Sequence, residues 1–329
     1  MPAVAQPELG SEEFALLTDA FRPELLAHCY RMLGSVQDAE DQVQETLLRA
    51  WRGYGSFQGR SSVRTWLHTI ATNACLRALE NRARRPLPSG LGAPSEDPAA
   101  PIAAPATEVP WLEPLPDALL RPESADPAAV ALARSGLRLA VIAALQQLPA
   151  RQRTVLILRD VLGWRAAEVA DLLGVSVIAV NSALQRARAQ LRQAAPAADE
   201  IREPLGQADR RLLDRYAAAI ETADVGAVVG LLHEDATFEM PPLPLWFRGR
   251  DHIGRFLGRW VLTTPGRFTT VPVAANGQPA LAVYERAADG SRHAHAIQVL
   301  DVRGSRIAGV VAFLDPALFP AFGLPAVLG

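Results

Sequence analysis

The segment from residue 165 to residue 191 most strongly constrains what this chain can fold into. Apolar residues recur there at steps of three and four, which is the spacing of one face of an α-helix. Gly174 falls where a tight turn needs a permissive backbone. The pattern therefore predicts a helix-turn-helix. The inward face of its second helix is predicted to consist of Val177, Val180, Leu184, Ala187 and Leu191.

The outward face of that second helix carries side chains that can read DNA. Asn and Gln can pair bidentately with adenine, and Arg with guanine. The candidates are Ser176, Asn181, Ser182, Gln185, Arg186 and Arg188. A helix-turn-helix pattern alone is only moderately specific, because repressors carry it as well.

An acidic helix is predicted much earlier in the chain. Its inward stripe would consist of Val36, Ala39, Val43, Leu47 and Ala50. Asp38, Asp41 and Glu45 then share another stripe, at positions i, i+3 and i+7. Taken alone, such a charge run is most often a solvated face.

A polar and basic helix follows closely, with Ser61 as its predicted N-cap. Its buried stripe is predicted to be Val63, Leu67, Ile70 and Ala74. The outward residues, suited to phosphate contact and base reading, are Arg64, Thr65, His68, Thr69, Asn73 and Arg77. The loop from Tyr54 to Gly59 is a candidate pocket wall, and Trp66 fits either the core or that pocket.

The net charge of −2 conceals two basic blocks. Residues 60–85 hold six Arg against one acid, and residues 134–192 hold nine Arg against three acids. The stretch between them, residues 86–133, holds one Arg against seven acids. Basic blocks separated by an acidic segment suit a nucleic-acid binder better than a uniformly neutral enzyme.

The organisation along the chain is read from composition and periodicity. We expect a disordered lead over 1–11, helical domains over 12–85 and 131–195, a Pro/Ala/acidic extended linker over 86–130, and an α+β domain over 205–329. In the linker, Trp111 and Leu112 suggest a docking motif or a chance apolar island. In the last domain we expect a helix near 251–262 and strands near 235–240, 268–275, 280–286, 294–303 and 306–314.

The acidic helix, the helix that bears Ser61–Leu67 and the helix-turn-helix, in this order, resemble a bacterial sigma factor of the sigma-70 family, in its extracytoplasmic-function (ECF) class. The resemblance covers roughly residues 12–85 and 130–195. It implies two all-α DNA-binding domains, sigma region 2 and a helix-turn-helix region 4. Region 2 would read the minus-ten element and region 4 the minus-thirty-five element. Docking on the Arg-rich clamp helices of the RNA polymerase core would fall to Asp38, Asp41, Gln44 and Glu45.

The C-terminal segments Leu232–Pro242, Trp246–Arg250 and Ala312–Pro316 look like the SnoaL-like branch of the conical α+β barrel fold. The resemblance implies a cavity but no particular reaction, and a fused regulator of sigma activity. A small-molecule ligand in that cavity is a hypothesis. Candidate cavity residues are His233, Glu239, Trp246, Tyr284, His295 and Gln298.

Two alternatives remain open at this point: a bifunctional protein whose barrel is a cyclase- or isomerase-like enzyme, and a helix-turn-helix repressor without polymerase contact. We favour neither, and we expect no catalytic residues, no cofactor and no metal site, because no phosphate loop or convincing metal-ligand spacing is visible. Cys29 and Cys75 are interpreted as buried free thiols. No apolar run approaches the length of a membrane span, so we expect a cytoplasmic protein that does not contact a membrane.

Overall fold

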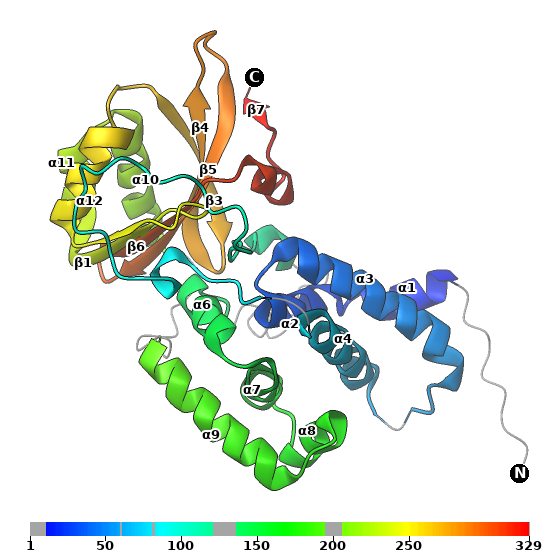
Figure 1. Cartoon of the computed structure of the whole chain (residues 1–329). Coiled ribbons are helices and arrows are strands. Elements are labelled where there is room, and N and C mark those ends of the chain that lie inside the picture. Colours follow the sequence, from blue (N-terminus) through cyan, green and yellow to red (C-terminus); the bar gives the residue numbers. More distant parts are fainter. Residues whose placement is uncertain (1–10, 60, 81–82, 121–135, 195–205, 329) are drawn as a thin grey trace, which may run out of the picture. The chain divides into compact units, whose positions relative to one another are not determined.

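The computed structural model describes residues 11–59, 61–80, 83–120, 136–194 and 206–328 (Figure 1). The chain divides into two compact units. Unit 1 comprises Met1–Arg84 and Leu119–Asp199, and unit 2 comprises Arg85–Ala118 and Glu200–Gly329. Residues 1–10 of the lead predicted over 1–11 and residues 121–130 of the predicted linker lie outside the described residues, and Ser11 is the first residue of a helix.

Unit 1 is helical throughout its described part. Its helices are α1 (Ser11–Asp19), α2 (Arg22–Leu33), α3 (Val36–Gly53), α4 (Val63–Leu79), α6 (Leu139–Gln147), α7 (Ala150–Leu156), α8 (Ala166–Leu173) and α9 (Val177–Ala194). Shorter helical turns are η1 (Tyr54–Ser56) and η4 (Ile157–Val161), and η3 (Asp117–Leu120) begins in unit 2 and ends in unit 1.

Local sequence signals position the helices of unit 1. Helix α2 ends at Gly34, whose φ of 73° lies in the left-handed region that favours glycine. Helix α3 begins directly after it, because the Ser35 hydroxyl accepts from the N–H of Asp38 at 3.2 Å. Helices α2, α3 and α4 pack against one another, so this turn sets the angle at which the acidic helix leaves the core.

Unit 2 is an α+β domain. Its helices are α10 (Gln207–Glu221), α11 (Val225–Leu231) and α12 (Arg250–Phe256), with the shorter turns η2 (Pro88–Gly90), η5 (Leu257–Val261) and η6 (Pro316–Phe322). Its strands are β1 (Leu232–Glu239), β2 (Trp246–Arg248), β3 (Phe268–Ala275), β4 (Gln278–Arg286), β5 (Arg292–Arg303), β6 (Arg306–Phe313) and β7 (Val327–Leu328). The five predicted strands coincide with β1, β3, β4, β5 and β6.

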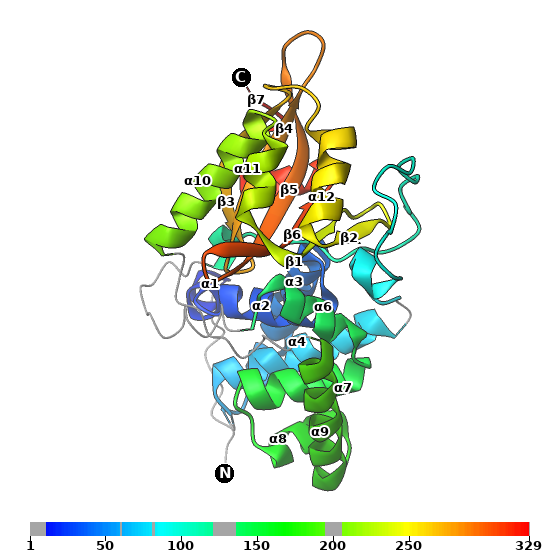
Figure 2. The same cartoon turned by 90° about the vertical axis from the view of Figure 1, so that its left-hand side faces the viewer.

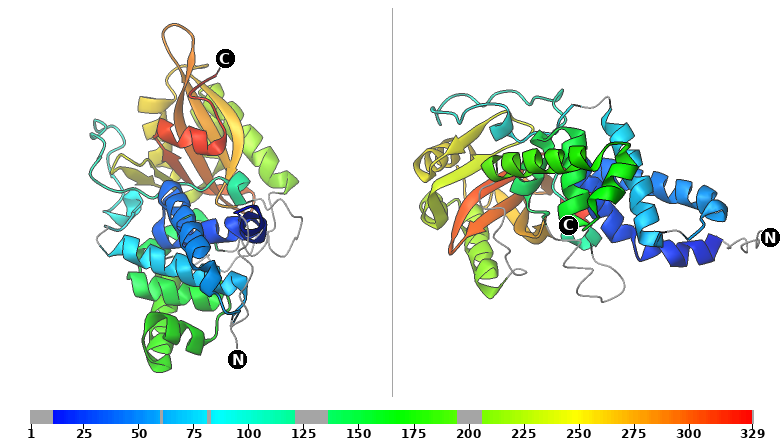
Figure 3. Two further views of the ribbon diagram at one scale, coloured as in Figure 1. Left: turned by 90° about the vertical axis from the view of Figure 1, so that its right-hand side faces the viewer. Right: turned by 90° about the horizontal axis from the view of Figure 1, so that it is seen from below.

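The strands form one mixed sheet in the order β2-β1-β6-β5-β4-β3, with β7 paired to β5. The pair β1–β6 is parallel, and the other pairs are antiparallel. Helices α10, α11 and α12 cover one face (Figure 2), and η6 lies on the other (Figure 3). Among the described strands β2 and β3 are the two ends of this order, so the sheet is open and the predicted closed conical barrel is not confirmed.

The stretch expected to be an extended linker is packed near both ends of its described part, at residues 87–88 and 112–117, whereas most of residues 89–105 are exposed. Residues 85–118 belong to unit 2, and we call this segment the strap. Leu112 and Leu115 of the strap are fully buried. Pro116 forms a bridge with Ala275 at the end of β3. The two buried leucines and the backbone bridge distinguish the strap from a free tether. Its Pro- and acid-rich composition did not predict this packing.

Candidate nucleic-acid and polymerase interface

The inward face of α3 follows the predicted stripe with one change. It consists of Val36, Ala39, Val43, Thr46 and Ala50. The predicted Leu47 is only partly buried. Thr46 fits the core because its hydroxyl donates to the carbonyl oxygen of Gln42 at 2.6 Å.

The opposite side of α3 carries the predicted docking residues. Asp41 and Gln44 are exposed, and Asp38 and Glu45 are partly exposed. The Glu45 carboxylate accepts from Nε of Arg49 at 2.6 Å, one helical turn further on. Leu48 lies on this face, four residues after Gln44 and three after Glu45, and 50% of its surface is exposed. This exposed apolar side chain within the acidic face was not predicted from the sequence, because its spacing also fits a core stripe.

Helix α4 begins one residue later than predicted. Ser62, not Ser61, is the N-cap, and its hydroxyl accepts from the N–H of Thr65 at 3.1 Å. The predicted buried stripe is partly wrong, because Val63 and Ile70 are only partly buried. Helix α4 packs against both α2 and α3, so its buried face is broad. That face consists of Leu67, His68, Ala71, Thr72, Ala74 and Cys75.

The prediction that His68 points outward toward DNA is wrong, since only 1% of its surface is exposed. Its Nδ1 is hydrogen-bonded to the carbonyl oxygen of Arg64 at 2.9 Å, and its ring meets the His28 ring edge to face at 5.3 Å. Burial lowers the pKa of both imidazoles. Polar residue type suggested exposure, whereas the histidine pair is part of the core between α2 and α4.

Arg64 is held against α2 rather than extended into solvent. Its guanidinium donates to both carboxylate oxygens of Glu24, with Nε at 2.9 Å from Oε2. This charge-assisted pair raises the pKa of Arg64. Thr65 and Thr69 are partly exposed, and the Thr69 hydroxyl donates to the Thr65 carbonyl oxygen at 2.9 Å.

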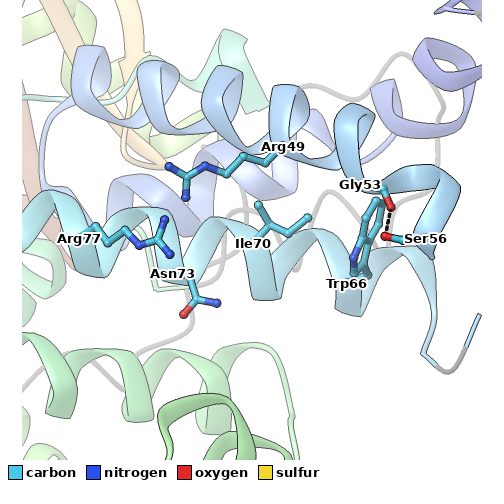
Figure 4. A pocket seen from close by; sticks show the side chains of 7 residues that line it. All are labelled: Arg49, Gly53, Ser56, Trp66, Ile70, Asn73 and Arg77. Atoms are coloured by element: carbon cyan, nitrogen blue, oxygen red, sulfur yellow. Dashed lines mark hydrogen bonds between the residues drawn. The ribbon is translucent and has the colours of Figure 1, made fainter. Parts of the chain in front are cut away.

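The remaining candidates of α4 line a pocket between α3 and α4 (Figure 4). The pocket has a volume of about 340 Å³. Its lining consists of Arg49, Gly53, Ser56, Trp66, Ile70, Asn73 and Arg77. Figure 4 shows Arg49 and Arg77 toward one end and Trp66 with Gly53 and Ser56 toward the other. The pocket thus combines cationic groups, a primary amide and an aromatic ring.

The aromatic end of the pocket is held by the loop predicted to be its wall. The Phe57 ring lies 4.7 Å from the Trp66 ring, centroid to centroid. The Tyr54 ring is 6.2 Å from each of them. The Ser56 hydroxyl donates to the Gly53 carbonyl oxygen at 2.7 Å, which fixes the turn between α3 and the loop. Trp66 therefore belongs to the pocket as well as to a ring cluster.

Helices α8 and α9 form the predicted helix-turn-helix. The turn contains Gly174 with a φ of 63°. The two helices are bent by 102° relative to each other. The Ser176 hydroxyl caps α9 by accepting from the N–H of Ala179 at 3.2 Å. A short turn with a left-handed glycine thus presents α9 across α8.

The outward face of α9 is largely as predicted. Asn181, Gln185 and Arg186 are exposed, and Ser182 is partly exposed. Val180, Leu184 and Ala187 are buried. The prediction that Val177 points inward is wrong, since 41% of its surface is exposed. Val177 lies in the first turn of α9, which is less covered than the later turns.

Arg188 is exposed but already has a partner. Its Nε and NH2 donate to the two carboxylate oxygens of Asp160 at 2.8 and 2.6 Å. This pair raises the pKa of Arg188. Arg188 therefore braces α9 against the preceding η4 turn, a role that sequence spacing did not reveal.

A buried arginine joins the two halves of unit 1. Arg153 of α7 donates to the carbonyl oxygens of Met32, Gln146 and Leu148 and to the Gln146 side chain. The Gln146 amide donates to the Arg31 carbonyl oxygen at 3.3 Å. Burial lowers the pKa of Arg153 to about 10. The last carbonyls of α2 thus find donors on α6 and α7.

The candidate cavity residues of unit 2 each have a different contact. Gln298 accepts from the Tyr216 hydroxyl at 3.0 Å, and both are buried. The Tyr284 hydroxyl donates to the Pro325 carbonyl oxygen at 3.0 Å. His295 lies 3.4 Å from the Glu285 carboxylate. His233 is exposed, and its Nδ1 accepts from the N–H of Asp235 at 3.3 Å.

The last two cavity candidates contact the strap. Glu239 is buried, and its Oε2 accepts from the N–H of Ser89 at 2.8 Å. Burial raises the pKa of Glu239, and the bond from Ser89 partly opposes that rise. The indole N–H of Trp246 donates to the Gly92 carbonyl oxygen at 3.0 Å. A strap fixed to these strands was not foreseen from the sequence.

The strap residues singled out from the sequence have their own positions. Leu112 is fully buried, and its N–H donates to the Pro86 carbonyl oxygen at 3.1 Å. Trp111 is partly buried, and its indole N–H donates to the Ala106 carbonyl oxygen at 2.9 Å.

Within the described ranges, no group of three or more His, Cys, Asp or Glu side chains could hold a metal ion. Cys29 and Cys75 are buried free thiols. No single helix of the described part is long and apolar enough to cross a membrane, and α8 and α9 meet that test only when joined across their bend.

Three family models match the chain. Sigma-70 region 2 matches residues 17–85, Sigma-70 region 4 matches 138–191, and a SnoaL-like domain matches 213–310. The first two contain α2 to α4 and α6 to α9, and the third contains most of the sheet of unit 2.

Two relatives that match over nearly the whole chain are ECF sigma factors. The ECF RNA polymerase sigma factor SigG of Mycobacterium tuberculosis is 52% identical over 315 residues, which is 95% of this chain and 84% of SigG. The ECF sigma factor SigJ of the same species is 31% identical over 92% of this chain and 91% of SigJ. The crystal structure of SigJ aligns with a TM-score of 0.63 at 25% identity, covering 95% of this chain and 99% of that chain. The chain belongs to the ECF RNA polymerase sigma factors: it directs RNA polymerase core to promoter DNA, is not an enzyme, and carries a fused SnoaL-like regulatory domain.

Proposed function

We propose that this sigma factor divides promoter recognition between two surfaces of unit 1, while a third attaches it to polymerase. The attachment surface is the acidic face of α3, formed by Asp38, Asp41, Gln44 and Glu45. Its charge complements the Arg-rich clamp helices that the family resemblance gives as partner. Leu48 adds an exposed apolar contact at its centre.

The pocket between α3 and α4 receives an unstacked base of the minus-ten element. This assignment rests on one observation, the 340 Å³ hollow that joins Trp66, Asn73 and Arg77. An indole face stacks on any base, an amide can bond its Watson–Crick edge, and a guanidinium can hold its phosphate. Arg64, Thr65 and Thr69 lie on the same helix and extend this surface along the strand, with Arg64 also bracing α2.

The minus-thirty-five element is read as duplex by α9. Exposed Asn181, Gln185 and Arg186 offer the bidentate donors and acceptors that suit adenine and guanine edges in the major groove. Ser176 and Ser182 can bond phosphates or bases beside them. Arg188 contributes chiefly by fixing the helix, because Asp160 already holds its guanidinium.

The pocket assignment is tested with 2-aminopurine placed at each position of the minus-ten element. The fluorescence of this base rises when it leaves its stack. With holoenzyme we expect one position to change on promoter opening, and Trp66→Ala to remove the change while Trp66→Phe retains it. A Trp66→Ala holoenzyme with the wild-type signal would contradict the assignment.

We also propose that unit 2 tunes activity through the strap, with the chain acting in the cytoplasm beside polymerase. The strap connects regions 2 and 4 along the chain, so the conformation it adopts limits where the two regions can go. Asn276 anchors it, because its Oδ1 accepts from the N–H of Leu115 at 2.9 Å. A small ligand bound beside Glu239, where Ser89 of the strap contacts the sheet, would bias the strap only if it prefers one strap conformation.

The strap proposal is tested by Asn276→Gly in full-length protein. Asn276 has a φ of 58°, so glycine keeps the backbone favourable while it removes the side chain with its Oδ1 acceptor. We expect promoter-dependent transcription to change, upward if the strap restrains regions 2 and 4 and downward if it supports them. Asn276→Asp, which keeps the acceptor, is the control. Equal activity of all three proteins would contradict regulation through this contact.

The ligand is tested by thermal shift across a metabolite panel. A binder should raise the melting temperature of the wild type, and Glu239→Gln should weaken that effect. Absence of any binder would contradict the ligand step alone.

A further inference from the structure

The first turn of α9 carries an apolar side chain that the polar reading surface does not use. Ile178 exposes 78% of its surface, the largest exposed fraction among the large apolar residues of α9. A single exposed apolar residue is ordinary on a protein surface. The position of this one is informative, because residues three, four and seven steps later on a helix share its face. Those residues are Asn181, Ser182 and Gln185.

Ile178 therefore lies one turn before the proposed base-reading residues and in line with them. In helix-turn-helix proteins the N-terminal residues of the second helix reach the base edges. The major groove offers a hydrocarbon group at one base only, the C5 methyl of thymine. The polar residues of α9 can identify adenine and guanine, but none of them prefers that methyl group.

The charges around Ile178 suit DNA rather than an acidic protein surface or a membrane. Helix α9 contains no Asp or Glu, and it carries Arg186, Arg188 and Arg192. The acids of the elements next to α9 are Asp160, which Arg188 holds, Glu168, which Arg165 holds, and Asp171 of α8. Helix α9 itself is neutral from Val177 to Gln185 and positive from Arg186 on, so the face that bears Ile178 presents no negative charge of its own to phosphates.

We propose that Ile178 is a specificity-determining residue that packs its side chain against the C5 methyl of a thymine in the minus-thirty-five element. The proposal rests on the assignment of α9 as the minus-thirty-five reader. It adds an apolar contact to a stripe of α9 whose other members, Asn181, Ser182 and Gln185, carry hydrogen-bonding side chains. The element selected by this factor must then contain a thymine whose methyl group, rather than its hydrogen bonds, is needed.

The test is a methyl scan of a promoter that holoenzyme has selected from a random library. Each thymine of the minus-thirty-five element is replaced in turn by deoxyuridine, which lacks only the methyl group. Holoenzyme is formed with full-length wild type, Ile178→Ala or Leu16→Ala, and the affinity for each promoter is measured. Leu16 of α1 is the control, because it is equally exposed, at 79%, and lies outside the surfaces assigned above. Alanine is a strong helix former, so Ile178→Ala should leave α9 folded.

One thymine should behave differently from the others. Its replacement should weaken wild-type binding about four-fold, which corresponds to the burial of one methyl group (~0.8 kcal/mol). Ile178→Ala should weaken binding to the natural promoter and be insensitive to the replacement, whereas Leu16→Ala should respond as the wild type does.

Two results would overturn the proposal. One is a selected element without thymine, and the other is additive losses from Ile178→Ala and from every deoxyuridine. Additive losses together with weaker binding of core polymerase would assign Ile178 to polymerase instead. In either case, wild-type initiation at the selected promoter would leave the sigma assignment and the role of α9 intact, so the two failures are distinguishable.

Discussion

The pocket of region 2 and the outward face of α9 are built in opposite ways. The pocket is concave, draws residues from α3, η1 and α4, and has an aromatic end closed by Phe57 and Trp66. The face of α9 is convex and comes from one helix. A hollow can enclose a base that has left its duplex, whereas a helix fits the intact major groove, which is about 12 Å wide. Under the proposed function, one chain would distinguish melted from duplex DNA by shape.

The interior supports differ as well. Between α2 and α4, the core contains the buried His28–His68 pair, and the partly exposed Arg64–Glu24 ion pair joins the same two helices. Helix α9 rests on Val180, Leu184 and Ala187, with its only ion pair among the described residues at the surface. The concave site therefore depends on buried polar groups, and the convex site depends on apolar packing.

The largest expected effect is loss of polymerase binding, because a chain that does not bind polymerase brings neither DNA-reading surface to the promoter. Replacing Asp41 and Glu45 by Arg places like charges against the clamp helices, which costs several kcal/mol. We expect the affinity for core polymerase to fall by more than about 100-fold. Fluorescence anisotropy of labelled chain measures it, with the double variant Asp214→Arg and Asp251→Arg, on α10 and α12, as the charge-matched control. Unchanged polymerase binding would remove α3 from the interface.

The next effect separates the concave surface from the convex one. Trp66→Ala should weaken binding of holoenzyme to a single-stranded minus-ten oligonucleotide by roughly 10- to 100-fold, because one base–aromatic stack contributes about 1–3 kcal/mol. Binding to a duplex that carries only the minus-thirty-five element should be unaffected. Circular dichroism melting checks the fold, and Trp66→Phe is the conservative control. Equal losses on both DNAs would break the comparison.

A smaller effect distinguishes two arginines of the convex surface. Arg186→Ala should cost roughly 1–2 kcal/mol and relax the preference at one base pair, because its guanidinium is the one exposed beside Gln185. Arg188→Ala should cost less than about 1 kcal/mol and leave the base preference intact, because it removes a surface pair with Asp160. Competition binding across single-base variants of the element measures both. A reversed order would mean that Asp160 releases Arg188 to DNA.

The smallest effect concerns pH. In the folded protein, the pKa values of His28 and His68 lie below the ordinary histidine value. At a pH between the folded and the ordinary value, the unfolded state therefore binds more protons than the folded state. The unfolding free energy should therefore decline as pH falls below about 6.5, the unperturbed histidine pKa. His28→Gln should flatten this slope, whatever its effect on stability at pH 8. Denaturant melts from pH 8 to 5 measure the slope, and an unchanged slope would contradict burial of neutral histidine.

Much of both surfaces could be predicted from sequence, because local patterns determine them. The step of three and four residues placed Val180, Leu184 and Ala187 inside and Asn181 and Gln185 outside. Gly174 indicated the turn that sets α9 across α8. These features depend on residues close together in the chain, so periodicity and turn chemistry suffice.

The errors arose where distant residues decide. His68 is polar and was therefore expected at the surface, but its burial depends on Glu24 and His28 of α2. Arg188 has a partner 28 residues earlier in the chain. The strap has the composition of a linker, yet Leu115 bonds to Asn276 far along the sequence. Composition and spacing carry no information about such partners.

The most direct test of the account is promoter-dependent transcription by core polymerase and full-length chain. Three versions of a selected promoter are compared: fully duplex, pre-melted across the minus-ten element, and duplex with a scrambled minus-thirty-five element. The account predicts initiation on the first two, loss on the third, and a Trp66→Ala defect largest on the fully duplex template. Initiation that ignores both elements, or a chain that starts no transcription on any selected promoter, would contradict it.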